Sequence, residues 1–217
     1  GYWKACEVEI GTLNEKNAWQ VVDREDWMNV LPSTWAFKCK HHPDGSIRKL
    51  KARFCARGDR QIEGMDFFET FAPVINWQTV RIMLVLSIIL GLQTVQVDYT
   101  AAFVQAPIDR DPNWDQMTDE ERQQSGVYLD MPRGFKESGK VLKLNQSLYG
   151  LKQSPRNFFQ HLKTILMDNP IGMLQSQCDL CLFYTSKVIC LVYVDDCLFF
   201  AKNGSNIDEV LKQIKSN

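Results

Sequence analysis

The sequence has 217 residues, of which 45% are hydrophobic and 24% are charged. Both fractions are close to the averages of soluble globular proteins, so intrinsic disorder and collagen-like or coiled-coil structure are excluded for the chain as a whole. The length predicts one large domain or two small lobes. The net charge of -1, from 25 basic and 26 acidic residues, argues against an extended basic nucleic-acid binder unless the charges are segregated along the chain.

Seven cysteines stand at irregular spacings among apolar neighbours, which predicts reduced thiols in an intracellular protein. Cys178 and Cys181 form a Cys-x-x-Cys pair, but no histidine or second cysteine pair of this kind stands nearby. Because a structural zinc site needs four ligands, we favour free thiols over zinc. The longest apolar run, Val80 to Leu92, is interrupted by Arg81 and Ser87 and is shorter than the ~20 residues of a membrane span, which favours a buried helix.

The first part of the chain predicts a helix and a short strand between Trp3 and Trp27, followed by a β-hairpin. The hairpin strands, Ser33 to Lys40 and Ile47 to Arg57, alternate apolar and polar residues around a turn at Asp44-Gly45. From residue 38 to residue 60, eight positive residues stand against two acidic ones, a local balance of +6. The positive residues are Lys38, Lys40, Arg48, Lys49, Lys51, Arg53, Arg57 and Arg60.

The middle of the chain predicts a helix from Asn76 to Gly91 and then a strand from Gln93 to Asp98, which ends on a carboxylate. The next segment, Asp109 to Arg122, carries six acidic and two basic residues, a balance of -4. It shows no apolar periodicity, so it predicts a solvated loop or insertion. Short strands are expected at Val127 to Met131 and at Val141 to Leu144, around a glycine-containing turn.

The last part of the chain predicts a helix in which Ser154 is the N-cap and Pro155 the first helical residue. The segment from Leu180 to Ala201 is the most β-like, because two apolar runs meet there at Tyr193-Val-Asp-Asp. Ser205 opens a final amphipathic helix, with Asp208 placed for a capping box.

The chemistry points to three aspartates. Asp195 and Asp196 alone have an ordinary explanation, since aspartate is common in turns. Asp98 also ends an apolar strand, and three carboxylates that converge would repel one another unless cations lay between them. Oxygen ligands of this kind suit Mg²⁺ or Mn²⁺, and paired divalent ions support in-line phosphoryl transfer. Lys51 and Arg53 of the basic hairpin could then neutralise a triphosphate, while its other basic residues follow a nucleic-acid backbone.

Several segments resemble one family. Tyr193-Val-Asp-Asp196 is similar to the signature of reverse transcriptases. Four further segments resemble the copia-type (Pseudoviridae-like) retrotransposon enzymes, namely Lys51 to Gly58, Phe68 to Val74, Val97 to Phe103 and Ser147 to Arg156. Together the segments follow the family's order and spacing over nearly the whole chain. The resemblance implies an α+β right-hand polymerase fold, with fingers and part of a palm.

The resemblance also implies roles for residues. The catalytic residues, which hold two Mg²⁺ or Mn²⁺ ions, would be Asp98, Asp195 and Asp196. The residues that contact the deoxynucleoside triphosphate would be Lys51, Arg53, Tyr99, Phe103 and Tyr149. The template-primer would be contacted by Lys49, Arg57, Gly150, Gln153, Pro155, Tyr193 and Val194. Phe103 would exclude a ribose 2′-hydroxyl, and the alternative is that it is an ordinary core residue. Tyr193 would pack against the primer end, and for it too a core position is the alternative.

The implied division gives fingers at 1–80, palm at 81–106, fingers again at 107–152 and palm again at 153–217. Ala106-Pro107 departs from the glycine-acid pair often found in the family, and the acidic stretch is longer than the usual linker. The chain starts without methionine and ends at Asn217, so we expect a piece of a Pol polyprotein, with an integrase upstream and a thumb and ribonuclease H downstream. Such enzymes work in cytoplasmic virus-like particles before the product enters the nucleus.

The predicted function is therefore RNA-directed DNA polymerase activity on an RNA or DNA template-primer, with no membrane partner. Two alternatives stay open at this point. A decayed or domesticated retroelement fragment would keep the fold and bind nucleic acid without polymerising. A structural domain that binds calcium or magnesium would explain the acidic residues but not the basic hairpin.

Overall fold

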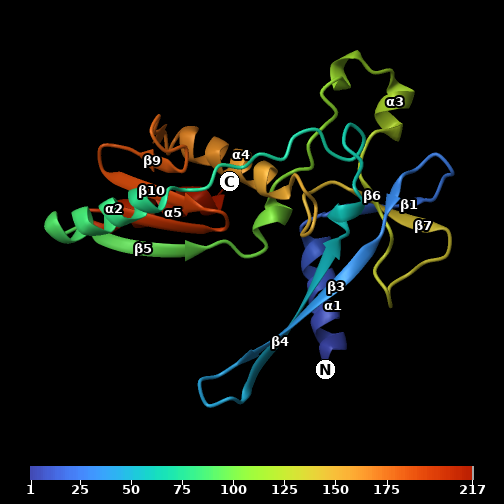
Figure 1. Cartoon of the computed structure of the whole chain (residues 1–217), viewed down its shortest axis with the longest axis horizontal. Coiled ribbons are helices and arrows are strands. Elements are labelled where there is room, and N and C mark those ends of the chain that lie inside the picture. Colours follow the sequence, from blue (N-terminus) through green and yellow to red (C-terminus); the bar gives the residue numbers. More distant parts are fainter. Residues whose placement is uncertain (217) are drawn as a thin grey trace. The chain divides into compact units, whose positions relative to one another are not determined.

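A computed structural model describes residues 1–216 (Figure 1). The chain forms two compact units, each of which combines helices and strands, so the predicted α+β class is confirmed. Unit 1 consists of Gly1–Thr70 and Phe103–Phe158, and unit 2 of Phe71–Ala102 and the chain from Phe159 onward. The unit boundaries thus fall at 70, 102 and 158, where the sequence division has 80, 106 and 152. The names fingers and palm stay predictions.

Unit 1 is built around two sheets. One has the strand order β1-β7-β6-β2, in which β2 and β6 are parallel and the other pairs antiparallel, and the second is the β3-β4 hairpin. Its elements are α1 (Tyr2–Glu15), β1 (Trp19–Asp23), β2 (Val30–Leu31), β3 (Ser33–His41), β4 (Ile47–Ala56), β6 (Tyr128–Leu129) and β7 (Lys140–Leu144), with short helices η1 (Gly58–Arg60), η3 (Trp114–Gln116) and α3 (Asp119–Gln124). The helix, strand and hairpin predicted before residue 60 are confirmed.

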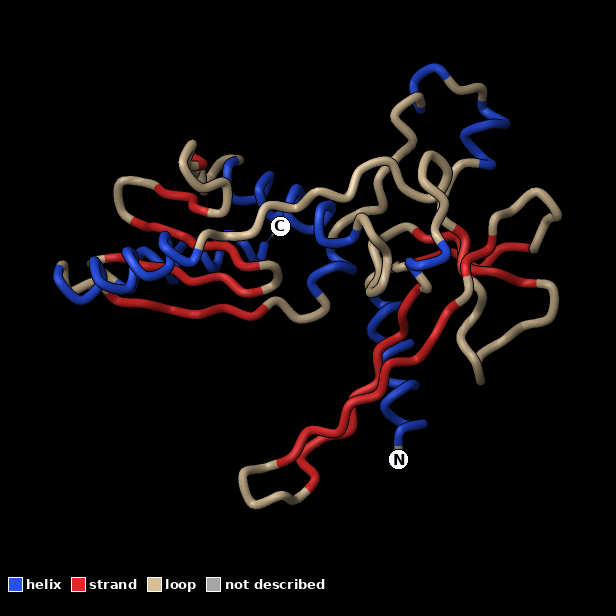
Figure 2. The backbone as a smooth tube through the Cα atoms, viewed as in Figure 1, coloured by secondary structure: helices blue, strands red, loops and turns tan. Residues whose placement is uncertain are grey.

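The β3-β4 hairpin is a long ribbon (Figure 2). Its turn is held by Asp44, whose Oδ1 accepts hydrogen bonds from the Ser46 N–H and hydroxyl, and by Gly45 at φ 85°. Helix α1 packs against β4, and it also contacts β3, where the rings of Tyr2 and Phe37 are 4.9 Å apart. Alternate residues therefore serve different purposes: one face packs on α1, and the other face is left for the charged side chains.

Two glycines allow a close backbone approach in unit 1. Gly150 has φ 90°, and a side chain there would collide with the carbonyl oxygen of Ala56 at the end of β4. The approach is fixed by the Ala56 N–H, which donates to the Tyr149 carbonyl at 2.8 Å. A side chain at Gly58 would in turn collide with the Gly150 carbonyl. The strand that approaches Gly150 is thus the protein's own β4.

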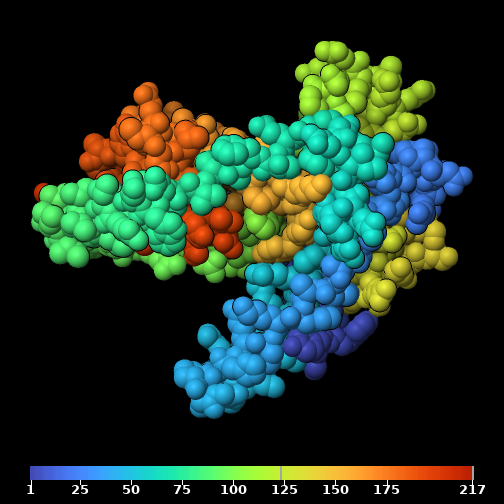
Figure 3. Space-filling model, in the orientation of Figure 1, coloured from blue at the N-terminus to red at the C-terminus, as the bar shows by residue number. Residues whose placement is uncertain are grey.

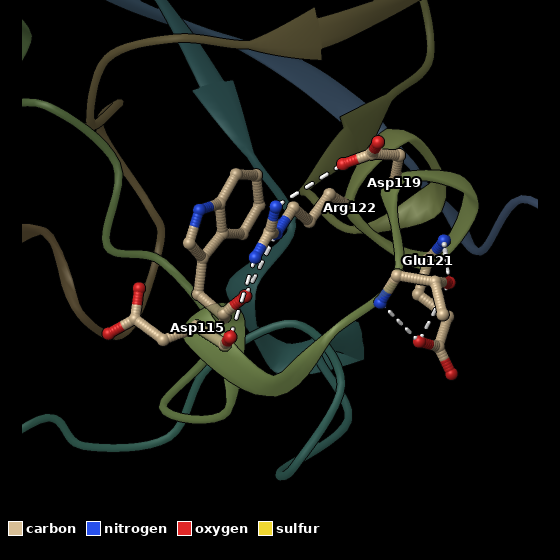
Figure 4. Close-up of polar contacts among 6 residues, drawn as sticks. Asp115, Asp119, Glu121 and Arg122 are labelled. Atoms are coloured by element: carbon tan, nitrogen blue, oxygen red, sulfur yellow. Dashed lines mark hydrogen bonds and ion pairs between the residues drawn. The ribbon is translucent and has the colours of Figure 1, made fainter.

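The acidic segment is not the open loop that its sequence predicts, because it contains η3 and α3. Thr118 and Glu121 form a capping box, in which each side chain accepts the other's backbone N–H. Arg122 donates to the carbonyls of Trp114 and Asp115 and pairs with Asp119 at 3.2 Å (Figure 4). Local polar bonds thus build these short helices without an apolar face, which is why periodicity missed them.

Unit 2 is built on one five-stranded sheet with the order β5-β11-β10-β9-β8, antiparallel throughout. Helix α5 packs against β11 and β5. The elements are α2 (Trp77–Ile89), β5 (Gln93–Asp98), β8 (Leu174–Gln175), β9 (Leu182–Tyr184), β10 (Val188–Tyr193), β11 (Asp196–Ala201) and α5 (Gly204–Ser216). Helix α4 (Ser154–Met167) begins in unit 1 and ends in unit 2, and η2 (Ala102–Gln105) begins at the other boundary.

One face of this sheet is the core of unit 2. Cys190, Phe199 and Val95 lie in one cross-strand row, and Phe183 pairs with Cys190 on the other side. Phe183 and Phe199 are fully buried, and the Phe183 ring lies 6.4 Å from that of Phe159 on α4. This packing fixes the register of the sheet, because a slip by one residue would move every core side chain to the other face.

Helix α2 was expected to be buried, and this expectation is wrong. Only Met83 and Ser87 of α2 are buried, whereas Ile88 is 82% and Ile89 70% exposed. Figure 3 shows the side chains of this green helix on the visible surface. An apolar run in the sequence predicts a hydrophobic helix but does not tell how much of that helix is covered. In this structure only one narrow side of α2 packs against other residues of the chain.

Two helix starts also differ from expectation. Ser154 is the first residue of α4 and not its N-cap, and its hydroxyl donates to the Leu148 carbonyl at 2.6 Å. The last helix begins at Gly204, and the Asn203 side chain, not Ser205, accepts the first turn's N–H. In α4 the serine hydroxyl is used by a preceding carbonyl, and in α5 the neighbouring asparagine side chain takes the capping role.

All seven cysteines are free thiols, as expected. Burial raises the pKa of Cys181 to about 12, so this thiol of the Cys-x-x-Cys pair is held protonated. Within residues 1–216, no helix is both long and apolar enough to cross a membrane.

We predict that Gly150→Ala lowers the free energy of unfolding by ~3 kcal/mol or more in urea titrations, because a left-handed conformation and a backbone collision both disfavour it. Gly139→Ala is the matched control. Gly139 has φ 72° and open space around it, so only the ~1–2 kcal/mol conformational cost applies. Equal losses in the two variants would show that the contact with Ala56 contributes nothing.

Candidate functional site

Two of the three predicted catalytic aspartates are direct cross-strand neighbours. Asp196, the first residue of β11, pairs with Asp98, the last residue of β5, and on its other side with Tyr193 of β10. Directly paired residues point to the same face of a sheet, with Cβ atoms about 4.5–5.5 Å apart. This face is opposite to the one that carries Phe183 and Phe199, and further along the strands it also carries the buried residues Leu191 and Phe200.

The third aspartate lies in the tight turn between β10 and β11. The Asp195 carbonyl accepts the Tyr99 N–H at 3.1 Å, which ties this turn to the end of β5. Val194, the other turn residue, has φ 55°. A β-branched residue rarely adopts this conformation, which costs roughly 1–3 kcal/mol and is typical of functional sites. Tyr193 and Val194 are 46% and 41% exposed, so the turn presents these side chains outward.

The donors of this site suit a hard divalent cation. Asp98 and Asp196 are like charges placed opposite each other, an arrangement that is destabilising unless a cation lies between them. Asp196 Oδ1 also accepts a hydrogen bond from Gln96 at 3.2 Å. In the part of the chain that the structure describes, no group of three His, Cys, Asp or Glu side chains is already arranged around a metal position. The carboxylates of Asp98 and Asp196 nevertheless fit a divalent cation by their charge and by their oxygen ligands, and Asp195 is the third candidate ligand.

A basic face, defined here as Lys38, Lys40, Lys49, Lys51 and Arg53, follows one side of the β3-β4 hairpin. Lys38 pairs directly with Lys51, and Lys40 with Lys49. A hollow of ≈ 300 Å³ lies between Ala36, Phe37 and four of these cations. Burial, and then the charges of Arg53 and Lys40, lower the pKa of Lys51. Paired like charges around a hollow favour an anion as the ligand.

Arg53 connects the basic face to two other predicted nucleotide contacts. Its guanidinium carbon lies 4.8 Å from the centre of the Tyr149 ring, and the Tyr149 ring lies 5.2 Å from that of Phe103, edge to face. Phe103 also contacts Phe158 at 6.2 Å. The Nε atom of Arg53 is buried and has no hydrogen-bond partner among the described residues. Unit 1 therefore brings three of the five predicted nucleotide contacts together, beside Lys51.

Other predicted residues have different surroundings. Tyr99 lies in unit 2, where burial, and then the neighbouring thiols of Cys197 and Cys190, raise the pKa of its hydroxyl. Gln153 is fully buried, accepts a hydrogen bond from Gln61 and donates to the Asp66 carbonyl at 2.8 Å. Its side chain therefore supports the fold of unit 1 and offers no surface to a template. No local sequence pattern indicates this burial, because a polar residue before a helix is usually exposed.

Three predicted template-primer contacts lie at or near the surface. Lys49 is exposed on the basic face, and Pro155 is half-buried in the first turn of α4. Arg57 is exposed but makes two hydrogen bonds to Asp59, at 2.7 and 2.8 Å. This ion pair holds the pKa of the Asp59 carboxyl at about 2. A phosphate at Arg57 would therefore have to compete with Asp59.

The sequence also contained residues whose roles were missed. Lys38 and Lys40 were expected only as part of the general basic surface of the hairpin, although their spacing of two along a strand places them on one face with Lys51. Gln96 stands two residues before Asp98, so the same period places it beside Asp196. Alternation along the strands was the signal that could have identified both.

Comparison with known proteins gives one family. A family model described as "Reverse transcriptase (RNA-dependent DNA polymerase)" matches residues 16–217. The Pol polyprotein of transposon TNT 1-94 from Nicotiana tabacum is 30% identical over 92% of this chain, and that of transposon RE2 from Arabidopsis thaliana is 34% identical over 90%. The family and the fold class expected from the sequence are confirmed.

More distant relatives agree. The Gag-Pol polyprotein of transposon Ty1-DR4 from Saccharomyces cerevisiae is 28% identical over 99% of this chain. The chain spans 14%, 13% and 12% of these three relatives, about one seventh of their length. A solved structure of a foamy viral protease-reverse transcriptase in complex with double-stranded DNA matches 97% of this chain, and the match spans 28% of that protein's chain. The two are 14% identical, with a TM-score of 0.41. That similarity is too low to add to the fold assignment.

We predict that Asp98→Asn raises the free energy of unfolding by about 0.5 kcal/mol when divalent ions are chelated, because it removes a cross-strand repulsion. Millimolar Mg²⁺ should then stabilise the parent more than the variant, since a ligand stabilises the state that binds it. Thermal unfolding with and without Mg²⁺ measures both effects. A parent that gains no stability from Mg²⁺ would argue against a cation between these carboxylates.

Proposed function

Because this chain belongs to the reverse transcriptase (RNA-dependent DNA polymerase) family, we propose that it carries the polymerase site of a transposon Pol polyprotein. The reaction adds deoxynucleotides to a primer on an RNA or DNA template. The observation that supports this most is the cross-strand pair Asp98 and Asp196, with Asp195 in the adjoining turn. A structural domain that binds calcium or magnesium would not need the basic face of the hairpin.

In the proposed reaction, the primer 3′-hydroxyl oxygen forms a bond to the α-phosphorus, the bond from this phosphorus to the β-phosphate bridge breaks, and pyrophosphate leaves with its electron pair. Asp98, Asp195 and Asp196 are the residues that would hold Mg²⁺ or Mn²⁺. The chemistry that these ions supply when bound is activation of the hydroxyl and neutralisation of the leaving group. Gln96 keeps one Asp196 oxygen in a hydrogen bond and so limits its rotation.

Lys51 and Arg53 are proposed to bind the phosphates of the incoming deoxynucleoside triphosphate. The unpaired buried Nε of Arg53 supports this, because a buried donor without an acceptor is costly unless a ligand supplies one. The Tyr149 ring restricts the guanidinium by its stacking contact. Phe103, held edge to face by Tyr149, is proposed to exclude a 2′-hydroxyl from the sugar position.

The template-primer is the proposed macromolecular partner. Lys38, Lys40 and Lys49 extend the basic face beyond Lys51, as expected of a surface that follows a phosphate backbone. Tyr193, next to the aspartates and exposed, is proposed to pack against the primer end. No observation favours a fragment that has lost the activity, since all three aspartates are present and two are in register.

We predict that Asp195→Asn abolishes Mg²⁺-dependent deoxynucleotide incorporation on oligo(dT)-primed poly(rA). The assay uses a Pol polypeptide that contains this chain. Asp208→Asn, which changes an exposed aspartate of α5, is the matched control and should keep the parent rate. A variant at position 195 that incorporates as fast as the parent would refute the assignment of this residue.

We also predict that Lys51→Ala raises KM for the deoxynucleotide about tenfold or more, because a lost hydrogen bond from a charged donor is worth ~1.5–3 kcal/mol. Arg48→Ala removes a positive charge from the same strand outside the basic face and should change KM little. Steady-state kinetics at fixed template-primer measures this difference. Equal effects of both substitutions would indicate general electrostatic attraction instead of a phosphate contact.

A further inference from the structure

Asp179 joins two segments of unit 2 that are far apart in the sequence. It lies just before β9, and its Oδ1 accepts the N–H of Cys181 at 3.0 Å. Its Oδ2 accepts the N–H of Asn76 at 3.0 Å and the hydroxyl of Thr79 at 2.6 Å. One carboxylate therefore binds the loop before β9 and the first turn of α2 at the same time.

These bonds complete a helix cap from outside the helix. Asn76 is the N-cap of α2, and its side chain accepts the N–H of Gln78 at 2.9 Å. In a capping box, the third helical residue would accept the N–H of the N-cap. In α2 that residue is Thr79, which donates to Asp179, and Asp179 accepts the Asn76 N–H in its place. The negative charge is also favourable at a helix N-terminus.

The capped turn carries the side chain that contacts the catalytic hairpin turn. Trp77 is the first residue of α2, and its ring centre lies 6.3 Å from that of Tyr193. A hollow of ≈ 240 Å³ beside these two rings is lined further by Val80, Leu191 and Asp196. The position of the α2 N-terminus therefore bears on how Tyr193 lies beside the aspartates.

We propose that Asp179 is a positioning residue, which sets the α2 N-terminus against the sheet and, through Trp77, orders the turn from Tyr193 to Asp196. The resemblance to reverse transcriptases assigned no role to Asp179, Thr79 or Trp77. The consequence for catalysis rests on the proposed function. The consequence for the order of the turn does not, since it concerns contacts within unit 2 alone.

The experiment separates positioning from simple helix stabilisation. Asp179→Ala removes both the cap and the link to β9, whereas the double variant Asp179→Ala with Thr79→Glu restores the cap within α2 and leaves the link broken. Thr79→Val removes a single hydrogen bond and serves if Asp179→Ala does not fold. Amide hydrogen exchange is measured on the 217-residue chain without substrate. The KM for template-primer is measured on a Pol polypeptide that contains this chain.

In Asp179→Ala, exchange should rise about fivefold in α2 and at Tyr193 to Asp196, the factor that corresponds to the ~1 kcal/mol of a lost cap. The double variant should regain protection in α2 but not in the turn, and its KM should stay above that of the parent. Thr79→Val should show the same pattern more weakly. The proposal would be overturned if amide exchange at the turn were unchanged in Asp179→Ala or in Thr79→Val. It would also be overturned if the double variant regained both the protection of the turn and the KM of the parent. A parent that does not polymerise would refute the proposed function, while the exchange data would still decide the role of Asp179.

Discussion

Asp98 and Asp196 lie opposite each other on adjacent strands of one sheet, and the remaining structure of unit 2 keeps these like charges together. The energy for this comes from the other face of the sheet, where Phe183 and Phe199 are fully buried. Because side chains alternate along strands, the register that buries Phe183 and Phe199 also places both carboxylates together at the strand ends of the opposite face. In the proposed function, a divalent cation that binds between the carboxylates relieves this repulsion.

The same alternation organises the charges of unit 1. On the β3-β4 hairpin it gathers Lys38, Lys51 and their neighbours on one face, while the opposite face packs against α1. The acidic segment, Asp109 to Arg122, carries a balance of -4 elsewhere in the chain and offsets most of the +6 of the hairpin segment. The net charge of -1 is thus a cancellation between separate surfaces, and only the local charges indicate which ligands the chain binds.

Periodic features of the fold could be predicted from the sequence, because strands and helices repeat their side-chain pattern locally. The hairpin, the strand that ends at Asp98 and the paired strands around Asp195 follow from such patterns. Contacts between distant segments could not be predicted in this way. The exposure of α2, the burial of Gln153 and the bonds of Asp179 to the first turn of α2 depend on which segments meet, and no local pattern carries that information. Caps were missed where a neighbouring polar residue, such as Asn203, took the place of the expected one.

The proposed function requires that the carboxylates at the ends of β5 and β11 bind a divalent cation, and paramagnetic Mn²⁺ measures such binding residue by residue. In ¹⁵N-labelled chain, substoichiometric Mn²⁺ should broaden the amide resonances of residues 97–99 and 194–197 first. The acidic segment, Asp109 to Arg122, is an internal control, because it has more carboxylates but no cross-strand pair. We predict selective broadening at the turn between β10 and β11, and we predict that Asp98→Asn abolishes it. Broadening that starts in the acidic segment, or is the same in both places, would contradict it.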